Sequence, residues 1–216
     1  MTNAQPTTLT ARLRAEILAG RLAPGDRLIE LQLTKRFNEG RAALRSALVE
    51  LEKEGLVQRE ANRGAVVRRI SLAEVLQITE ARCALETLVA QHAARRATRA
   101  DRTALTKLLT SMRDAVSRRD YVTYSECNGV LHARLREISD HRVANELVRN
   151  LRDRATSHQF RLALMPGRAE ESLPQHEAII NAVVAGDELA AADAMRKHLE
   201  SVVEVLQRWA DVGLPT

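Results

Sequence analysis

Residues 20–69 read GRLAPGDRLIELQLTKRFNEGRAALRSALVELEKEGLVQREANRGAVVRR, and this stretch decides the fold of the first third of the chain. A Pro24-Gly25 turn precedes a short amphipathic segment, which a tight turn at 38–40 separates from a longer helix. Gly55 ends that helix, and a small hairpin with Gly64 at its tip follows. With an apolar-periodic segment at 9–18, the stretch predicts a winged helix-turn-helix.

The helix that begins at Arg41 carries Arg45 four residues later, so both guanidinium groups lie on one helix face. Such a helix can reach base edges and phosphates in the major groove of DNA. An arginine at the hairpin tip suits a narrow minor groove. We expect the DNA contacts to come from Arg41, Ala42, Arg45, Arg63 and Gly64.

The formal charge is unevenly distributed along the chain. Residues 1–70 hold 13 Lys and Arg against 8 Asp and Glu, whereas residues 71–216 hold 20 of each, so the whole excess of +5 lies in the first part. A basic excess is typical of a surface that binds a polyanion. Charge alone leaves open the alternative of a solvated surface with a chance asymmetry.

The remainder of the chain is helical in pattern. Aromatic residues make up only 2% of the 216 residues, and Ala, Leu, Arg and Glu abound, which favours helix over sheet. Ser71 and Glu74 have the spacing of a capping box. We expect an antiparallel bundle of six helices near residues 71–97, 102–118, 120–138, 143–164, 171–185 and 189–209. The expected domains are a winged helix-turn-helix at 4–71 and an all-helical domain at 72–210, a mostly α fold.

Targeting and redox signals are weak. The first ten residues lack the basic and apolar regions of a secretion signal, and no apolar run approaches the roughly 20 residues needed to cross a bilayer. Cys83 and Cys127, the only two cysteines, are far apart and form neither a disulfide framework nor a metal clip. We expect a cytoplasmic protein without a membrane partner.

Three histidines fall on the apolar stripes of their helices: His132, His176 and His198. His176 lies ten residues before Gly186 and His198 twelve after it, so the two can face each other in an antiparallel hairpin. Asn128 precedes His132 by one helical turn. Three imidazoles and an amide oxygen suit a divalent metal such as zinc or nickel. The alternative is a set of core histidines satisfied by hydrogen bonds.

Two arginines are candidates for binding an acidic effector. Arg82 lies one turn before Glu86, and Arg134 is near His132 in sequence. A guanidinium group that faces a cavity can hold a carboxylate through paired hydrogen bonds. Each arginine could instead be solvated or ion-paired on the surface.

One set of motifs runs through both parts of the chain: Pro24-Gly25-Asp26-Arg27-Leu28, Glu30, Leu33, Phe37, Arg41, Arg45, Ala47, Leu48, Glu54-Gly55-Leu56, Arg63-Gly64, Arg82 with Glu86, Asn128 with His132, His176 and His198. In these motifs the chain resembles GntR-family transcriptional regulators of the FadR type, whose second domain is the all-helical FCD domain, over residues 9–206. The expected number of helices after the wing, six, is similar to that of the shorter, VanR-like branch.

The resemblance implies a homodimer that binds a palindromic DNA operator and responds to a small carboxylate at a metal site, most simply a repressor that the acid releases. Two departures qualify it: the turn at 38–40 lacks the family's Gly-Val-Ser, and Asn128 replaces the family's aspartate ligand. A metal-dependent enzyme with a three-histidine site is a competing hypothesis, although the sequence offers no HExxH motif and no evident general base. A third is an interaction protein that has lost regulated DNA binding.

Overall fold

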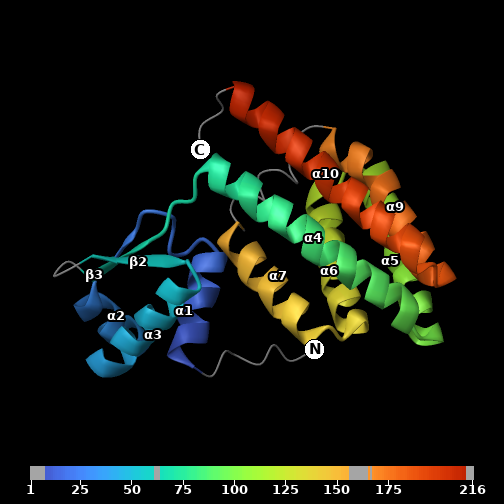
Figure 1. Ribbon diagram of the computed structural model, residues 1–216. Helices are drawn as coiled ribbons and strands as arrows, with labels where there is room; N and C mark the ends of the chain where they lie inside the picture. Colours follow the sequence, from blue (N-terminus) through green and yellow to red (C-terminus); the bar gives the residue numbers. More distant parts are fainter. Residues whose placement is uncertain (1–7, 61–63, 156–164, 166, 213–216) are drawn as a thin grey trace. The chain divides into compact units, whose positions relative to one another are not determined.

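The computed structural model describes residues 8–60, 64–155, 165 and 167–212 (Figure 1). The chain divides into two compact units between Ile70 and Ser71. None of the described helices is both long and apolar enough to cross a membrane.

The first unit consists of three helices and a small antiparallel sheet. The helices are α1 (Leu9–Leu18), α2 (Glu30–Phe37) and α3 (Arg41–Lys53), and the strands are β1 (Arg27–Leu28), β2 (Val57–Glu60) and β3 (Gly64–Val67). The strand order is β1-β3-β2. The wing therefore has three strands rather than the two predicted from sequence. The two-residue β1 is too short to show the alternation by which a strand is recognised, and only its pairing with Val66 and Ala65 defines it.

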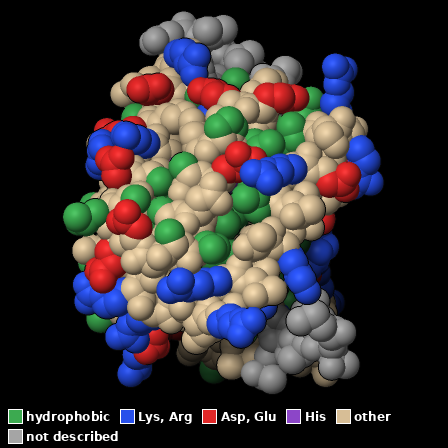
Figure 2. Space-filling model, turned by 90° about the vertical axis from the view of Figure 1, so that its right-hand side faces the viewer, with side chains coloured by type: hydrophobic (Ala, Val, Ile, Leu, Met, Phe, Trp, Pro, Cys, Tyr) green, Lys and Arg blue, Asp and Glu red, His purple; other side chains and the backbone are tan. Residues whose placement is uncertain are grey.

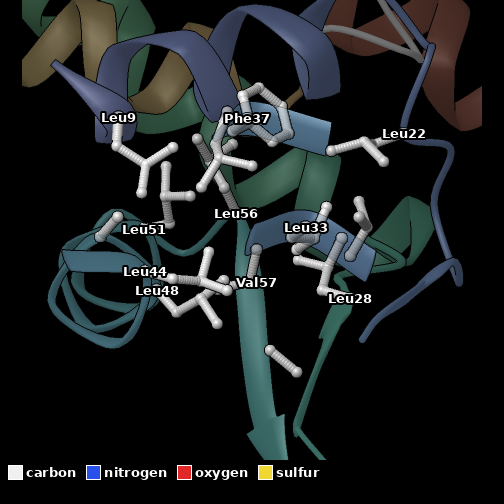
Figure 3. Close-up of a cluster of buried hydrophobic side chains, with 14 residues drawn as sticks. Leu9, Leu22, Leu28, Leu33, Phe37, Leu44, Leu48, Leu51, Leu56 and Val57 are labelled. Carbon is white, nitrogen blue, oxygen red and sulfur yellow. The ribbon is translucent and has the colours of Figure 1, made fainter. Parts of the chain in front are cut away.

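A cluster of 14 buried apolar residues holds this unit together (Figure 3). Leu44, Leu48 and Leu51 project from one face of α3, at the spacing of one helical stripe, towards Leu13 of α1 and Val57 of β2. Leu13, Leu44 and Leu51 are completely buried. Because this stripe fixes the inner face of α3, the opposite face of the helix is presented to solvent.

Residues 38–40 determine the conformation of the turn between α2 and α3. Asn38 ends α2 in the left-handed conformation, at φ 54°, which asparagine tolerates better than most residues. Glu39 accepts a hydrogen bond of 3.2 Å from Arg12 of α1, and Arg12 also donates to the carbonyl of Phe37. Gly40 occupies the N-cap of α3 and supplies no side-chain bond. Hydrogen bonds from Arg12 of α1 thus stabilise the turn, in place of a capping hydroxyl at position 40.

The second unit contains six described helices, which confirms the all-helical bundle. They are α4 (Leu72–Arg96), α5 (Arg99–Ser117), α6 (Tyr121–Ser139), α7 (Arg142–Arg154), α9 (Arg168–Ala185) and α10 (Glu188–Val212). α5 begins three residues before its predicted start because Thr98 and Asp101 form a capping box. The helix predicted for 143–164 ends at Arg154, and residues 156–164 of that prediction lie outside the described part of the chain.

Helix α4 is the central element of the second unit. It packs against α10, α6, α7 and α9, and Figure 1 shows it running between α7 and α10. Side chains that α4, α6, α9 and α10 direct inward therefore meet in the interior of the bundle.

The face shown in Figure 2 mixes acidic and basic side chains, in keeping with the balanced charge of residues 71–216.

Candidate functional site

The predicted DNA-contacting residues of α3 lie on its solvent face. Arg41, Ala42 and Arg45 are all exposed, whereas Leu44 and Leu48 are buried on the other side of the helix. Gly64 begins β3 at φ 86°, and its Cβ position would lie 3.1 Å from the carbonyl oxygen of Leu28. Arg63 lies outside the described residues.

Glu30 adds a contact that sequence reasoning missed. This first residue of α2 accepts hydrogen bonds of 3.1 and 3.2 Å from Nε of Arg45. The ion pair holds one guanidinium group of the exposed face in a defined direction. Glu30 was recognisable only as a motif residue, because the contact joins two helices across a turn.

The second unit brings the three predicted histidines together. His132 of α6, His176 of α9 and His198 of α10 are all buried, and their candidate ligand atoms lie within 4.8 Å of one another. The ring centroids of His176 and His198 are 4.4 Å apart, and that of His132 is 6.2 and 5.7 Å from them. The spacing along three separate helices thus produces one compact cluster.

A buried chain of charges fixes His132. Its Nδ1 lies 2.6 Å from the Glu86 carboxylate, and Arg82, one turn earlier on α4, donates to the same carboxylate at 2.8 Å. Arg82 and Glu86 expose only 4% and 2% of their surface. A carboxylate only accepts, so Nδ1 of His132 carries the proton and Nε2 is left with a lone pair.

The other two histidines have neutral partners on their Nδ1 atoms. Nδ1 of His176 lies 2.8 Å from the Tyr124 hydroxyl, and Nδ1 of His198 lies 2.9 Å from Oε1 of Gln175. The Gln175 amide nitrogen donates to Ser201 at 3.0 Å, which orients its oxygen towards His198. Neither Tyr124 nor Gln175 was expected from sequence, because a polar residue on a helix gives no sign of the histidine that it contacts.

Burial decides the protonation of this cluster. Desolvation lowers the pKa of His132, although Glu86 opposes the shift. Burial, reinforced by the neighbouring imidazoles, holds the pKa of His176 and His198 well below its usual range. Burial alone would raise the pKa of Glu86, but Arg82 and His132 hold it well below the usual value. The three rings are therefore neutral near pH 7, the form that binds metals.

A cavity of about 70 Å³ lies beside the cluster and is lined by the three histidines, Asn128 and three arginines: Arg82, Arg152 and Arg168. Arg168, the first residue of α9, is 6% exposed and donates to Ser201 at 3.1 Å. Burial lowers the pKa of Arg152 to about 10, which leaves it charged at neutral pH. The cavity therefore has a cationic wall.

One predicted effector residue lies elsewhere. Arg134 does not line this cavity; its side chain is 54% exposed and its guanidinium group pairs with Glu137 on the same helix at 2.9 Å. Two positions along α6 separate it from His132, and this rotates its side chain away from the buried stripe. Arg152 and Arg168, which sequence proximity to the histidines did not indicate, occupy the wall instead.

The donor set at the cluster fits a divalent metal. His176 Nε2 and Asn128 Oδ1 are buried, and neither has a hydrogen-bond partner among the described residues. Two buried polar atoms without partners, next to a cavity, would each carry a desolvation cost that a metal ligand bond removes. Three imidazole nitrogens and one amide oxygen match the ligand types that zinc and nickel accept.

Comparison with known proteins finds a family match for each of the two units. Residues 7–67 match the model of bacterial regulatory proteins of the gntR family, and residues 77–201 match the FCD domain. The HTH-type transcriptional repressor RspR of Escherichia coli K12 is 32% identical over 91% of this chain and 86% of its own length. The HTH-type transcriptional regulator LutR of Bacillus subtilis is 29% identical over 87% of this chain and 94% of its own.

A solved structure has the same fold. McbR/YncC of E. coli superimposes with a TM-score of 0.75 over 93% of this chain and 96% of that one, at 19% identity. The fold and the relatives together define a helix-turn-helix transcriptional regulator. The chain belongs to the GntR family, with an FCD domain as its second unit. The enzyme alternative receives no support, because the relatives are named as regulators.

Proposed function

We propose that this protein is a homodimeric, ligand-responsive repressor that acts in the cytoplasm. A small organic acid bound beside a metal in the helical unit would release it from DNA. The observation that carries the proposal is the convergence of His132, His176 and His198 beside the arginines of the cavity wall. A metal centre and cationic groups in one small cavity form a site for an anion.

The charge of the cavity favours a carboxylate. Arg82, Arg152 and Arg168 line it, and Glu86, the carboxylate that pairs with Arg82, is the buried group that opposes them. An anion that enters would be stabilised both by a metal and by guanidinium hydrogen bonds. The cavity, at about 70 Å³, is well below the roughly 300–1,000 Å³ of pockets for drug-sized ligands, which favours a small acid.

The metal would be held by His132, His176, His198 and Asn128, and would supply a Lewis-acidic position for the carboxylate. Arg168 and Arg152 would orient the rest of the effector, with Arg82 engaged mainly by Glu86. Asn128 is neutral where the family carries aspartate, so the site would bind its metal less tightly than relatives with the carboxylate.

Arg41, Ala42 and Arg45 of α3 would contact the major groove, and Arg63 and Gly64 would bring the wing to the minor groove. The exposure of the α3 residues and the Glu30–Arg45 ion pair support this assignment. The two units would communicate because the effector binds one state of the dimer more tightly than another, which shifts operator occupancy.

The test begins with selection of an operator from random DNA, followed by a screen of small carboxylic acids against the zinc-loaded protein. A true effector raises the melting temperature and weakens binding to the operator. Arg168→Ala is expected to abolish both responses, whereas Arg134→Ala, a matched change outside the cavity, is expected to leave them intact. The absence of an enriched palindrome would overturn the DNA-binding part, and turnover of the acid at catalytic rates would overturn the regulator.

A further inference from the structure

Four groups extend in a line from the histidine cluster to the first turn of α9. Nδ1 of His176 lies 2.8 Å from the Tyr124 hydroxyl, which lies 2.7 Å from Oγ of Ser172. Ser172 in turn donates to the carbonyl oxygen of Ala169 at 3.4 Å. His176, Tyr124 and Ser172 expose between 1% and 4% of their surface, so bulk water does not compete for these bonds.

The end of this line favours one direction for the bonds in it. A backbone carbonyl only accepts, so the contact with Ala169 uses the single proton of Ser172. With that proton so placed, Oγ of Ser172 accepts from the Tyr124 hydroxyl at 2.7 Å, and the Tyr124 oxygen accepts from Nδ1 of His176 at 2.8 Å.

We propose that Ser172 and Tyr124 form a directed hydrogen-bond relay that fixes the neutral tautomer of His176, with the proton on Nδ1 and the Nε2 lone pair towards the other two imidazoles. The inference rests on the metal centre proposed above and assigns to it two positioning residues. Nε2 of His176 is buried without a partner among the described residues, as a lone pair reserved for a ligand would be.

The relay matters more for His176 than the outer contacts do for its neighbours. Glu86 can only accept from His132, and the bond to Ser201 turns the Gln175 oxygen towards His198. His132 and His198 can therefore each carry the proton only on Nδ1. A line of two hydroxyls could also run in reverse, with Tyr124 donating to Nδ1 and a proton left on Nε2. That proton would lie on the atom that must bind the metal. In that arrangement Ser172 would donate to Tyr124 at 2.7 Å and would no longer donate to Ala169, so the Ser172–Ala169 bond favours the first direction.

The experiment uses the full-length, metal-free protein labelled with ¹⁵N-histidine, in which two-bond ¹H–¹⁵N correlations report the tautomer of each ring. The spectrum of His176→Gln identifies the resonances of His176. We expect Nδ1–H in the wild type. Ser172→Ala removes the anchor and is expected to allow Tyr124 to donate to Nδ1, which moves the His176 proton to Nε2.

Zinc affinity, measured by competition with a chromophoric chelator, gives the second readout. Ser172→Ala is expected to weaken it by about 10- to 100-fold, the usual cost of losing an outer partner of a ligand. Tyr124→Phe keeps the ring, removes the relay and is expected to weaken zinc binding as well. Ser111→Ala is the matched control, because Ser111 is exposed and also donates to a backbone carbonyl of its own helix, that of Lys107.

The outcomes separate the relay from the metal centre. A wild-type His176 with its proton on Nε2, or a Ser172→Ala protein that keeps the proton on Nδ1, overturns the relay. A wild type that binds no zinc overturns the metal centre, and the tautomer spectrum still decides the relay in that case. A simple packing role for Ser172 would lower the melting temperature without moving the His176 proton.

Discussion

The Glu86 carboxylate lies 2.6 Å from Nδ1 of His132 and 2.7 Å from a guanidinium nitrogen of Arg82, with all three side chains almost fully removed from solvent. One carboxylate on the central helix therefore compensates a buried cation and fixes the tautomer of a candidate metal ligand. The fold and the site depend on the same group.

Glu86→Gln is accordingly expected to be strongly destabilising. The change leaves the Arg82 cation buried without its counter-charge, a loss of about 3–5 kcal/mol in other buried pairs. Urea denaturation of the metal-free protein measures the free energy of unfolding. Glu177→Gln is the control: its carboxylate pairs with Arg113, whose side chain is 56% exposed, and the expected loss is at most about 1 kcal/mol. Equal losses in the two variants would contradict the role given to Glu86.

The metal-free protein is expected to lose stability as the pH falls below about 6.5. The folded-state pKa values of His132, His176 and His198 are depressed from the usual 6.5, so the unfolded chain binds more protons below that pH. Their contribution is complete above 6.5 and declines as acid protonates the unfolded state. The depressed pKa of Glu86 adds a further loss below its usual value of 4.5. Melting temperatures in the presence of a chelator measure the effect of the histidines from pH 8 to 5 and that of Glu86 from pH 5 to 3. A His176→Gln/His198→Gln protein should show a flatter profile.

Arg41→Ala and Arg45→Ala are each expected to weaken binding to a selected operator by about 1–3 kcal/mol. Both guanidinium groups occupy the exposed face of α3, where they could pair with base edges or phosphates. Fluorescence anisotropy at several salt concentrations separates lost base contacts from lost phosphate contacts. Arg113→Ala, an exposed change in the helical unit, should bind as the wild type does; wild-type affinity in both α3 variants would refute the groove assignment.

Asn128→Asp is expected to tighten zinc binding about tenfold or more, equivalent to at least about 1.4 kcal/mol. The buried Oδ1 of Asn128 already lines the cavity without a partner among the described residues, and a carboxylate there adds a negative charge to the ligand set. Competition with a chelator measures the affinity. Asn150→Asp, a matched change at an exposed position of α7, should have no effect. Unchanged zinc affinity in Asn128→Asp would show that this residue is not a ligand.

Gly40→Ser tests the unusual turn before α3. Gly40 has φ −73° and no atom within 4 Å of its Cβ position apart from its chain neighbours, so a serine fits without strain. Its hydroxyl could cap α3, which is expected to stabilise the protein by a few tenths of a kcal/mol. The same hydroxyl could also reach a phosphate, so operator affinity should rise. A fall in melting temperature together with weaker DNA binding would mean that the turn requires glycine.

Much of the fold could be predicted from local sequence, because its helices carry strong stripes and clear end signals. The leucine stripe of α3 and the capping serine of α4 each depend on residues within a turn or two of one another. The strand β1 could not be predicted, because two residues become a strand only through hydrogen bonds to a distant partner. Helical spacing also indicated that His132, His176 and His198 face inward.

What the sequence by itself determined is therefore which side chains face solvent and which face inward: two arginines on the exposed face opposite a leucine stripe, and three histidines on inward-facing apolar stripes. Tertiary structure alone decided which groups meet them. Glu30 reaches Arg45, Tyr124 reaches His176, and Arg168 rather than Arg134 enters the cavity wall. The physical reason is that helical periodicity fixes the direction of a side chain about its own axis, whereas the partner at the end of that direction depends on how separate helices cross and on their relative levels.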